Sequence, residues 1–129
     1  MIVVDASAIL EVLLQTTAAT RISQRIFAAR DTLCAPHLID VEVAQVVRRY
    51  AREHTITTDR GAEALDDLAQ LPIHRYPHNV LLPRIWELRH NFTAYNAAYL
   101  ALAEVLDAPL VTRDRALGSA GSKARVEVL

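Results

Sequence analysis

Three acidic residues, Asp5, Glu42 and Asp114, stand where their side chains could do metal-assisted chemistry. Asp5 directly follows a short β-branched run, and Asp114 comes just after a second apolar run, so both are expected beyond the carboxyl ends of buried strands. Open α/β sheets bind their ligands outside those strand ends. Glu42 lies on a predicted helix, from which it would have to reach the same crevice. Because Mg²⁺ prefers oxygen ligands and keeps several waters, two or three such carboxylates predict a hard-cation site.

A cation held by these acids would lower the pKa of a bound water, orient it for in-line attack and neutralise charge developing on a phosphate. Each acid also has an ordinary structural interpretation. Asp5 can cap a helix, Glu42 can pair with an arginine such as Arg48 or Arg49, and Asp114 can sit in a turn. All three roles arising by chance in one chain is much less expected than any one of them alone.

The elements that must position these acids follow from hydrophobic periodicity. Short apolar runs alternate with longer segments of helical period, which is typical of a parallel sheet covered by helices. The predicted strands cover residues 2–4, 33–35, 73–76, 110–112 and 126–129, the last as an edge strand. One predicted helix begins near Ser7, and four others cover residues 38–50, 57–71, 80–89 and 93–104. The pattern therefore predicts an α/β fold.

Within the predicted helices, side-chain spacing indicates which faces are buried. On helix 93–104, Thr93 is a plausible N-cap, which places Asn96 in the first turn, near the positive end of the helix dipole. Trp86 is interpreted as a core residue. The predicted apolar stripe of helix 38–50 consists of Leu38, Val41, Ala44, Val46, Val47 and Tyr50. The acids of helix 57–71, interpreted as a solvated face, are Asp59, Glu63, Asp66 and Asp67.

Composition limits the classes of protein to consider. The 129 residues, 52% of them hydrophobic, suit one compact domain spanning 1–129. We expect no membrane span and no secretory signal, so a cytoplasmic location is the default expectation. Cys34 is the only cysteine, which excludes a disulfide or a cysteine-based zinc site within one chain. The net charge of −1 argues against tight, unaided binding of long nucleic acid.

Four segments together resemble a known family. They are Val3-Val4-Asp5-Ala6-Ser7-Ala8, Glu42 on the second long helix, the run from Thr93 to Ala103, and Val111-Thr112-Arg113-Asp114. In this order and at these intervals the chain resembles the PIN domain and, more narrowly, the VapC toxins of bacterial toxin–antitoxin pairs. The resemblance implies a three-layer α/β/α sandwich with a central twisted parallel sheet. It also implies Mg²⁺- or Mn²⁺-dependent cleavage of RNA. Family members typically dimerise, so a homodimer is expected, and a cognate VapB-type antitoxin is expected to inhibit the protein with a tail that reaches the active-site groove.

The resemblance also assigns roles to residues. Asp5 would be a metal ligand, Asp114 would complete the acidic pocket, and Glu42 would bind the metal directly or through water and help to activate the attacking water. Ser7 and Thr112 would support the ligands by hydrogen bonds, although local chemistry equally allows a helix-start and a strand-end hydroxyl. The arginines that flank Asp114 and would contact RNA phosphates are Arg113 and Arg115.

Asn96 is the departure from the family pattern, which has Asp within a Tyr-Asp-Ala run. An amide oxygen can still coordinate a hard cation, but it brings no negative charge, and its NH₂ group points donors at the same space. Asn96, counted among the metal-site residues with Asp5, Glu42 and Asp114, is therefore predicted to impair cleavage while leaving the fold intact. The alternative is a catalytically inactive PIN-fold binding module that sequesters antitoxin or RNA.

Overall fold

A five-stranded parallel sheet forms the centre of the protein. The computed structural model describes residues 1–28 and 30–129. Its strands occur in the order β3-β2-β1-β4-β5, and every neighbouring pair is parallel. The strands are β1 (Ile2–Val4), β2 (Leu33–Pro36), β3 (Ile73–Tyr76), β4 (Leu110–Thr112) and β5 (Val126–Val128). All five predicted strands are confirmed, and β5 is an edge strand as expected.

Helices occupy most of the chain between the strands. The α-helices are α1 (Ala6–Leu13), α2 (Ala19–Phe27), α3 (Leu38–Arg52), α4 (Thr58–Gln70), α5 (Leu82–Glu87) and α6 (Ala94–Leu106). Two short 3₁₀ helices, η1 (Asn79–Leu81) and η2 (Arg115–Gly118), complete the elements. Thr57 and Thr93 cap α4 and α6 through their side chains, accepting from the backbone N–H groups of Arg60 and Asn96. Sequence analysis missed α2, although Ala19, Ile22 and Ile26 are buried at helical spacing.

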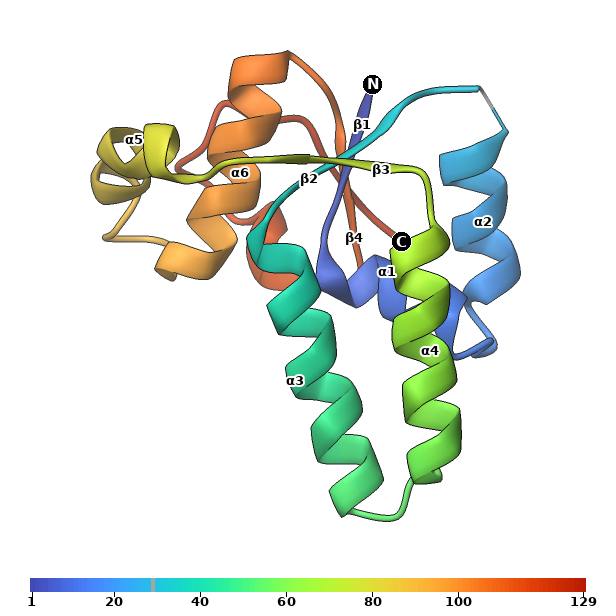
Figure 1. Ribbon diagram of the computed structural model, residues 1–129. Helices are drawn as coiled ribbons and strands as arrows, with labels where there is room; N and C mark the ends of the chain where they lie inside the picture. The colour runs from blue at the N-terminus through green and yellow to red at the C-terminus, as the bar shows by residue number, and fades with distance from the viewer. Residues whose placement is uncertain (29) are drawn as a thin grey trace.

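The strand order places helices on both faces of the sheet. The chain moves outward from β1 to β2 and β3 through α1 to α4, and then returns from β3 to β4 through α5 and α6 (Figure 1). Since parallel strands are joined by right-handed crossovers, reversing the direction of travel puts the second group of helices on the opposite face. The expected three-layer α/β/α sandwich is therefore confirmed. The strand order reverses at β1 and β4, whose carboxyl ends run toward α1 and α3.

The buried faces of two helices differ from the predicted ones. On α3 the buried residues are Ile39, Val43 and Val47, spaced by four, whereas Val41 is 72% exposed. Because each helical residue turns by about 100°, Val41 lies on nearly the opposite side from Ile39. The predicted stripe of α3 was thus wrong at Val41 and omitted Ile39 and Val43, whereas Val47 is buried as predicted. Trp86, predicted to be in the core, is 67% exposed, because Ile85 takes the inward position on α5.

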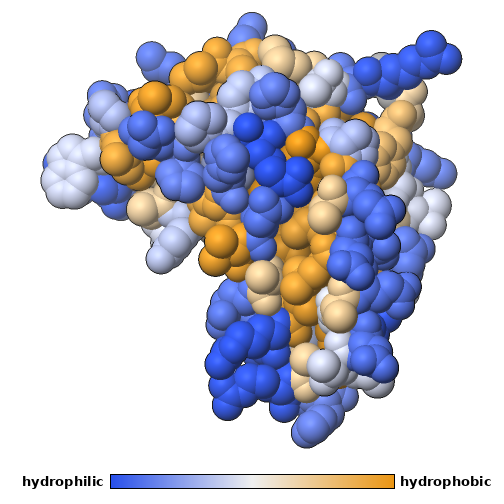
Figure 2. Space-filling view, viewed as in Figure 1, coloured by the Kyte–Doolittle hydropathy of each residue, from blue (hydrophilic) through white to orange (hydrophobic). Residues whose placement is uncertain are grey.

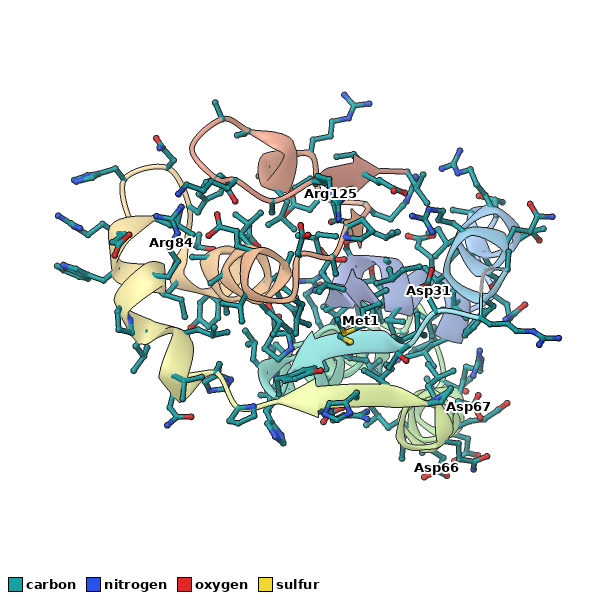
Figure 3. The ribbon with its side chains drawn as sticks, turned by 90° about the horizontal axis from the view of Figure 1, so that it is seen from above. Met1, Asp31, Asp66, Asp67, Arg84 and Arg125 are labelled. Carbon is teal, nitrogen blue, oxygen red and sulfur yellow. The ribbon has the colours of Figure 1, made fainter. Side chains whose placement is uncertain are left out.

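The α3–α4 pair extends from the sheet as a helical hairpin (Figure 1). Hydrophobic residues form a strip between these two helices, and hydrophilic residues flank it (Figure 2). The acidic residues of α4 are exposed as predicted, and Asp66 and Asp67 point away from the body of the protein (Figure 3). Of the helices in the described part of the chain, none has the length and apolar character to cross a bilayer.

Candidate functional site

Asp5 and Thr112 are brought together by the pairing of β1 with β4. The register matches Val4 with Val111, so the next residues, Asp5 and Thr112, lie side by side at the carboxyl ends of the two strands. The Thr112 hydroxyl donates to Asp5 Oδ2 at 2.6 Å. Asp5 is 5% exposed and Thr112 is fully buried. Parallel pairing therefore builds the centre of the site.

Ser7 joins this centre from the first turn of α1. Its hydroxyl donates to Asp5 Oδ1 at 2.8 Å and lies 3.2 Å from the Thr112 hydroxyl. The same oxygen accepts from the Arg113 backbone N–H at 2.9 Å, which ties the loop after β4 to α1. Asp5 also caps α1 by accepting from the Ala8 backbone N–H at 3.1 Å. The capping role considered for Asp5 is therefore real, and it occurs within the site.

Burial leaves Asp5 in a conflict of electrostatic effects. Desolvation raises the pKa of its carboxyl, the hydrogen bonds from Thr112, Ala8 and Ser7 act in the opposite direction, and repulsion from Asp114 raises the pKa further. The net direction is upward, because burial disfavours the charged form more than the donors favour it. A cation beside Asp5 would relieve both the desolvation and the repulsion.

Asp114 and Asn96 meet on the other side of this centre. The Asn96 side-chain NH₂ donates to Asp114 Oδ2 at 3.4 Å, from the first turn of α6 to the start of η2. Asp114 is held by two backbone contacts: its Oδ1 accepts from the Ala116 N–H at 2.9 Å, and its own N–H donates to the Thr112 hydroxyl at 2.9 Å. The residue at position 96 thus touches one of the three acids directly.

Glu42 reaches the site from α3 and is held by Tyr99. The Tyr99 hydroxyl donates to Glu42 Oε1 at 2.5 Å. Burial raises the pKa of Glu42, the bond from Tyr99 opposes this, and the charge of Asp5 raises the pKa further. Sequence analysis did not identify this partner of Glu42. The available signal was spacing, since Tyr99 follows Asn96 by three residues and therefore shares its face of α6.

None of the three acids has a cationic partner in the part of the chain that the structure describes. Among the described residues, no Arg, Lys or His nitrogen lies within 4.0 Å of a carboxylate oxygen of Asp5, Glu42 or Asp114. The ion pair considered between Glu42 and Arg48 or Arg49 is thus not formed. Within the same part of the chain, no three His, Cys, Asp or Glu side chains gather closely enough to hold a metal ion by themselves. The acids are near one another but do not form a closed cage.

The two arginines beside Asp114 differ in their surroundings. The Arg113 guanidinium donates to the Leu129 backbone carbonyl at 2.6 Å and lies 3.9 Å from Glu11. Arg115 is exposed on η2. Arg113 is thus engaged within the protein, which leaves Arg115 as the more accessible of the two.

An open pocket of about 480 Å³ borders the site between α1 and α3. Its walls are mostly apolar, and Glu42 and Ser7 of the site are among its lining residues. The other lining residues are Ala6, Leu10, Leu38, Val41, Gln45, Val46 and Tyr95. Val41, whose exposure contradicts the predicted stripe, forms part of this apolar wall.

Comparison with known proteins decides the family. The model of the PIN domain family matches residues 2–123. The chain belongs to the PIN-domain VapC ribonuclease family. Ribonuclease VapC9 of Mycobacterium tuberculosis is 43% identical over 121 residues, covering 94% of this chain and 91% of that protein. Ribonuclease VapC1 of the same organism is 41% identical over 119 residues, covering 92% and 89%.

Solved structures support the PIN fold. The crystal structure of PAE2754 from Pyrobaculum aerophilum has a TM-score of 0.74 at 21% identity, covering 97% of this chain and 89% of that one. At these levels of identity the likeness concerns the arrangement of the elements alone. The toxin, ribonuclease and PIN-domain descriptions that the resemblance implied are confirmed by the named relatives together with the family match.

Proposed function

We propose that this chain is the toxin of a toxin–antitoxin pair and carries a Mg²⁺- or Mn²⁺-dependent endoribonuclease site. Its metal site comprises Asp5, Glu42 and Asp114, with Asn96 at the fourth position. The observation that carries this proposal is the absence of a cationic partner for any of the three acids in the described part of the chain. Buried or half-buried carboxylates without such a partner are costly in a protein that does not supply a cation.

The chemistry of the donors fits a hard cation. The site offers carboxylate and amide oxygens only, with no thiolate or imidazole among its proposed ligands. Three acids do not close around one point, and this suits Mg²⁺, which typically uses one or two carboxylates and keeps several waters. When bound, such a cation supplies charge neutralisation and an activated water for hydrolysis of a phosphodiester bond.

The chain's own residues prepare that reaction. Thr112 and Ser7 fix both oxygens of Asp5, so this carboxylate is oriented before any ligand arrives. Burial raises the pKa of Glu42, so its carboxylate takes up a proton more readily than a solvent-exposed glutamate does. We propose that Glu42 accepts the proton of the attacking water and that Arg115 contacts an RNA phosphate next to the scissile bond.

Asn96 reduces this activity in the proposed account. Its NH₂ group donates to Asp114 and so occupies a carboxylate oxygen that would otherwise be offered to the cation. The site also carries one negative charge fewer than the family pattern. The same contact favours the second candidate function, a binding module that retains the fold and sequesters antitoxin or RNA without cutting it.

The proposed partners are a cognate VapB-type antitoxin, an RNA substrate and a second copy of the chain. The apolar pocket between α1 and α3 supports the first, because it would accept hydrophobic side chains of an antitoxin tail ending near the acids. A structure described as VapBC2 from Rickettsia felis bound to a DNA fragment from their promoter has a TM-score of 0.74 at 12% identity, covering 100% of this chain and 99% of that one. Light scattering after gel filtration would test the homodimer.

Cleavage assays with Mg²⁺ and with Mn²⁺ test the proposed function. The proteins to compare are the chain as it stands, Asn96→Asp, and the double variant Asp5→Ala, Asn96→Asp, all shown by circular dichroism to be folded. We expect Asn96→Asp to cut RNA faster than the parent by a factor of about 100, in line with the cost of disturbing a metal site. The double variant should be inactive, which excludes a contaminating nuclease.

A different result would favour the binding module. If Asn96→Asp cuts no faster than the parent across varied RNA substrates, position 96 does not limit the activity. If none of the folded proteins cuts RNA while the parent still binds it, the proposal of a nuclease is wrong for this chain.

A further inference from the structure

Tyr99 is the largest fully buried side chain of the described residues, with 1% of its surface exposed, yet its hydroxyl points to the site. That hydroxyl donates to Glu42 Oε1 at 2.5 Å, across 57 residues of sequence. One oxygen atom of α6 therefore contacts α3.

Packing alone does not account for a tyrosine here. Phenylalanine would fill the same space, and a buried hydroxyl without a partner would destabilise the fold. The hydroxyl has instead been matched with a carboxylate that has no cation within ion-pair distance in the described chain. It is also the only hydrogen-bond donor to Glu42 recorded among the described residues.

The position of Tyr99 on α6 connects the two sides of the site. Asn96 and Tyr99 are three residues apart and so project from one face of the helix. The first contacts Asp114, at the end of β4, and the second contacts Glu42, on α3. Helix α6 thus contacts two acids that come from different layers of the sandwich, one at the end of a sheet strand and one on a helix.

Glu42 needs such support because of its length. A glutamate side chain has three rotatable bonds and is free to take many orientations when nothing holds its carboxylate. With Oε1 held by Tyr99, the carboxylate is restrained, and Oε2 is left without a hydrogen-bond donor among the described residues.

We infer that Tyr99 is a positioning residue for Glu42: its hydroxyl orients this carboxylate for the cation site, beyond its contribution to the core. The inference rests on the proposed metal site. Removing the hydroxyl would leave the charges of the site unchanged and release only the orientation of Glu42. The expected loss is about tenfold in Mn²⁺ affinity, at the lower end of what partners of metal ligands contribute.

Mn²⁺ titration by calorimetry or by electron paramagnetic resonance tests this, with the full chain in both its Asn96 and its Asn96→Asp forms. The variants are Tyr99→Phe, Glu42→Ala and the two combined, and Tyr50→Phe is the matched control. Tyr50 is half-buried near the end of α3, two turns beyond Glu42, so removal of its hydroxyl should leave Mn²⁺ affinity unchanged. Tyr99→Phe should weaken binding about tenfold in the presence of Glu42 and not at all in the Glu42→Ala protein, which has no carboxylate for the hydroxyl to orient.

Two results would overturn the inference: unchanged affinity in Tyr99→Phe, or an equal loss with and without Glu42, which would indicate a general packing effect. Should Tyr99→Phe not fold, Glu42→Asp keeps the charge but withdraws it from the hydroxyl, and unchanged affinity there would equally overturn it. If neither form of the parent binds Mn²⁺, the proposed metal site fails. A crystal structure of Tyr99→Phe then decides the positioning role, which is supported by a displaced Glu42 carboxylate and refuted by an unmoved one.

Discussion

The carboxylate of Glu104 and the carboxylates of the site have opposite surroundings. Glu104, on α6, accepts two hydrogen bonds from Arg84, at 2.8 and 3.1 Å, one from the Ser122 hydroxyl and one from the Lys123 backbone N–H. Figure 3 shows Arg84 on the α5 side of this contact. Among the residues that the structure describes, the acids of the site have only hydroxyl, amide and backbone donors. One group is neutralised by the protein itself, and the other is not.

The pKa values follow this difference. The bonds from Arg84 lower the pKa of Glu104 to about 2, with smaller contributions from the Lys123 N–H and Ser122. Burial raises the pKa of Asp5 and of Glu42. An acid whose charge is favoured by its partners stabilises the fold, whereas an acid held charged without a cation costs stability and indicates a functional demand.

The largest expected effect concerns the acids of the site. Asn96→Asp should raise Mn²⁺ affinity by about 10- to 100-fold, because it adds a carboxylate and removes the donor that now contacts Asp114. Thermal denaturation at a fixed excess of Mn²⁺ should then show a larger increase in Tm for Asn96→Asp than for the parent. The double variant Asp5→Ala, Asn96→Asp is the control. An equal increase in all three proteins would mean that Mn²⁺ binds elsewhere.

The next effect concerns Glu104 and its pairing with Arg84. Glu104→Gln should lower the free energy of unfolding by about 2 kcal/mol at pH 7, because it weakens a set of charge-assisted hydrogen bonds. Urea denaturation measures this. Glu87→Gln is the matched control, since Glu87 pairs with the same Arg84 at 2.9 Å but has a side chain that is 64% exposed. Its effect should stay within about 0.5 kcal/mol. Similar losses in both variants would remove the distinction.

The pH dependence of the Glu104 effect sharpens the comparison. The pKa of Glu104 is depressed from 4.5 to about 2 in the folded protein, so its stabilising contribution is fully present above pH 4.5 and is lost as pH falls toward 2. The difference in unfolding free energy between the parent and Glu104→Gln should therefore shrink between pH 5 and pH 3. Urea titrations at these two pH values provide the measurement, and a constant difference would contradict the lowered pKa.

The smallest effect returns to the site. Glu42→Gln removes a half-buried charge without a cationic partner and keeps an oxygen that can accept from Tyr99. In the presence of a chelator, the free energy of unfolding should either increase or fall by less than about 0.5 kcal/mol. Urea denaturation again reports it. A loss of about 2 kcal/mol, as large as that expected for Glu104→Gln, would show that Glu42 is a structural residue.

Local pattern was sufficient for much of the fold. The β-branched run at Ile2–Val4 and the apolar run at Leu110–Thr112 form β1 and β4, two neighbouring inner strands, and Thr93 caps α6 as its type and position predicted. Periodicity was less reliable for direction. Apolar residues occur on several sides of α3, and only packing against its neighbours selects Ile39, Val43 and Val47 as the buried row.

The sequence by itself determined the family, the residues that form the strands, and the presence of Asn rather than Asp at position 96. Residue type and spacing along the chain are enough for these. The tertiary structure alone decided that Tyr99 holds Glu42, that Arg84 neutralises Glu104 and that Trp86 is exposed. Such contacts join elements that lie far apart in sequence. They depend on the rotation and placement of whole helices, which a periodic pattern does not specify.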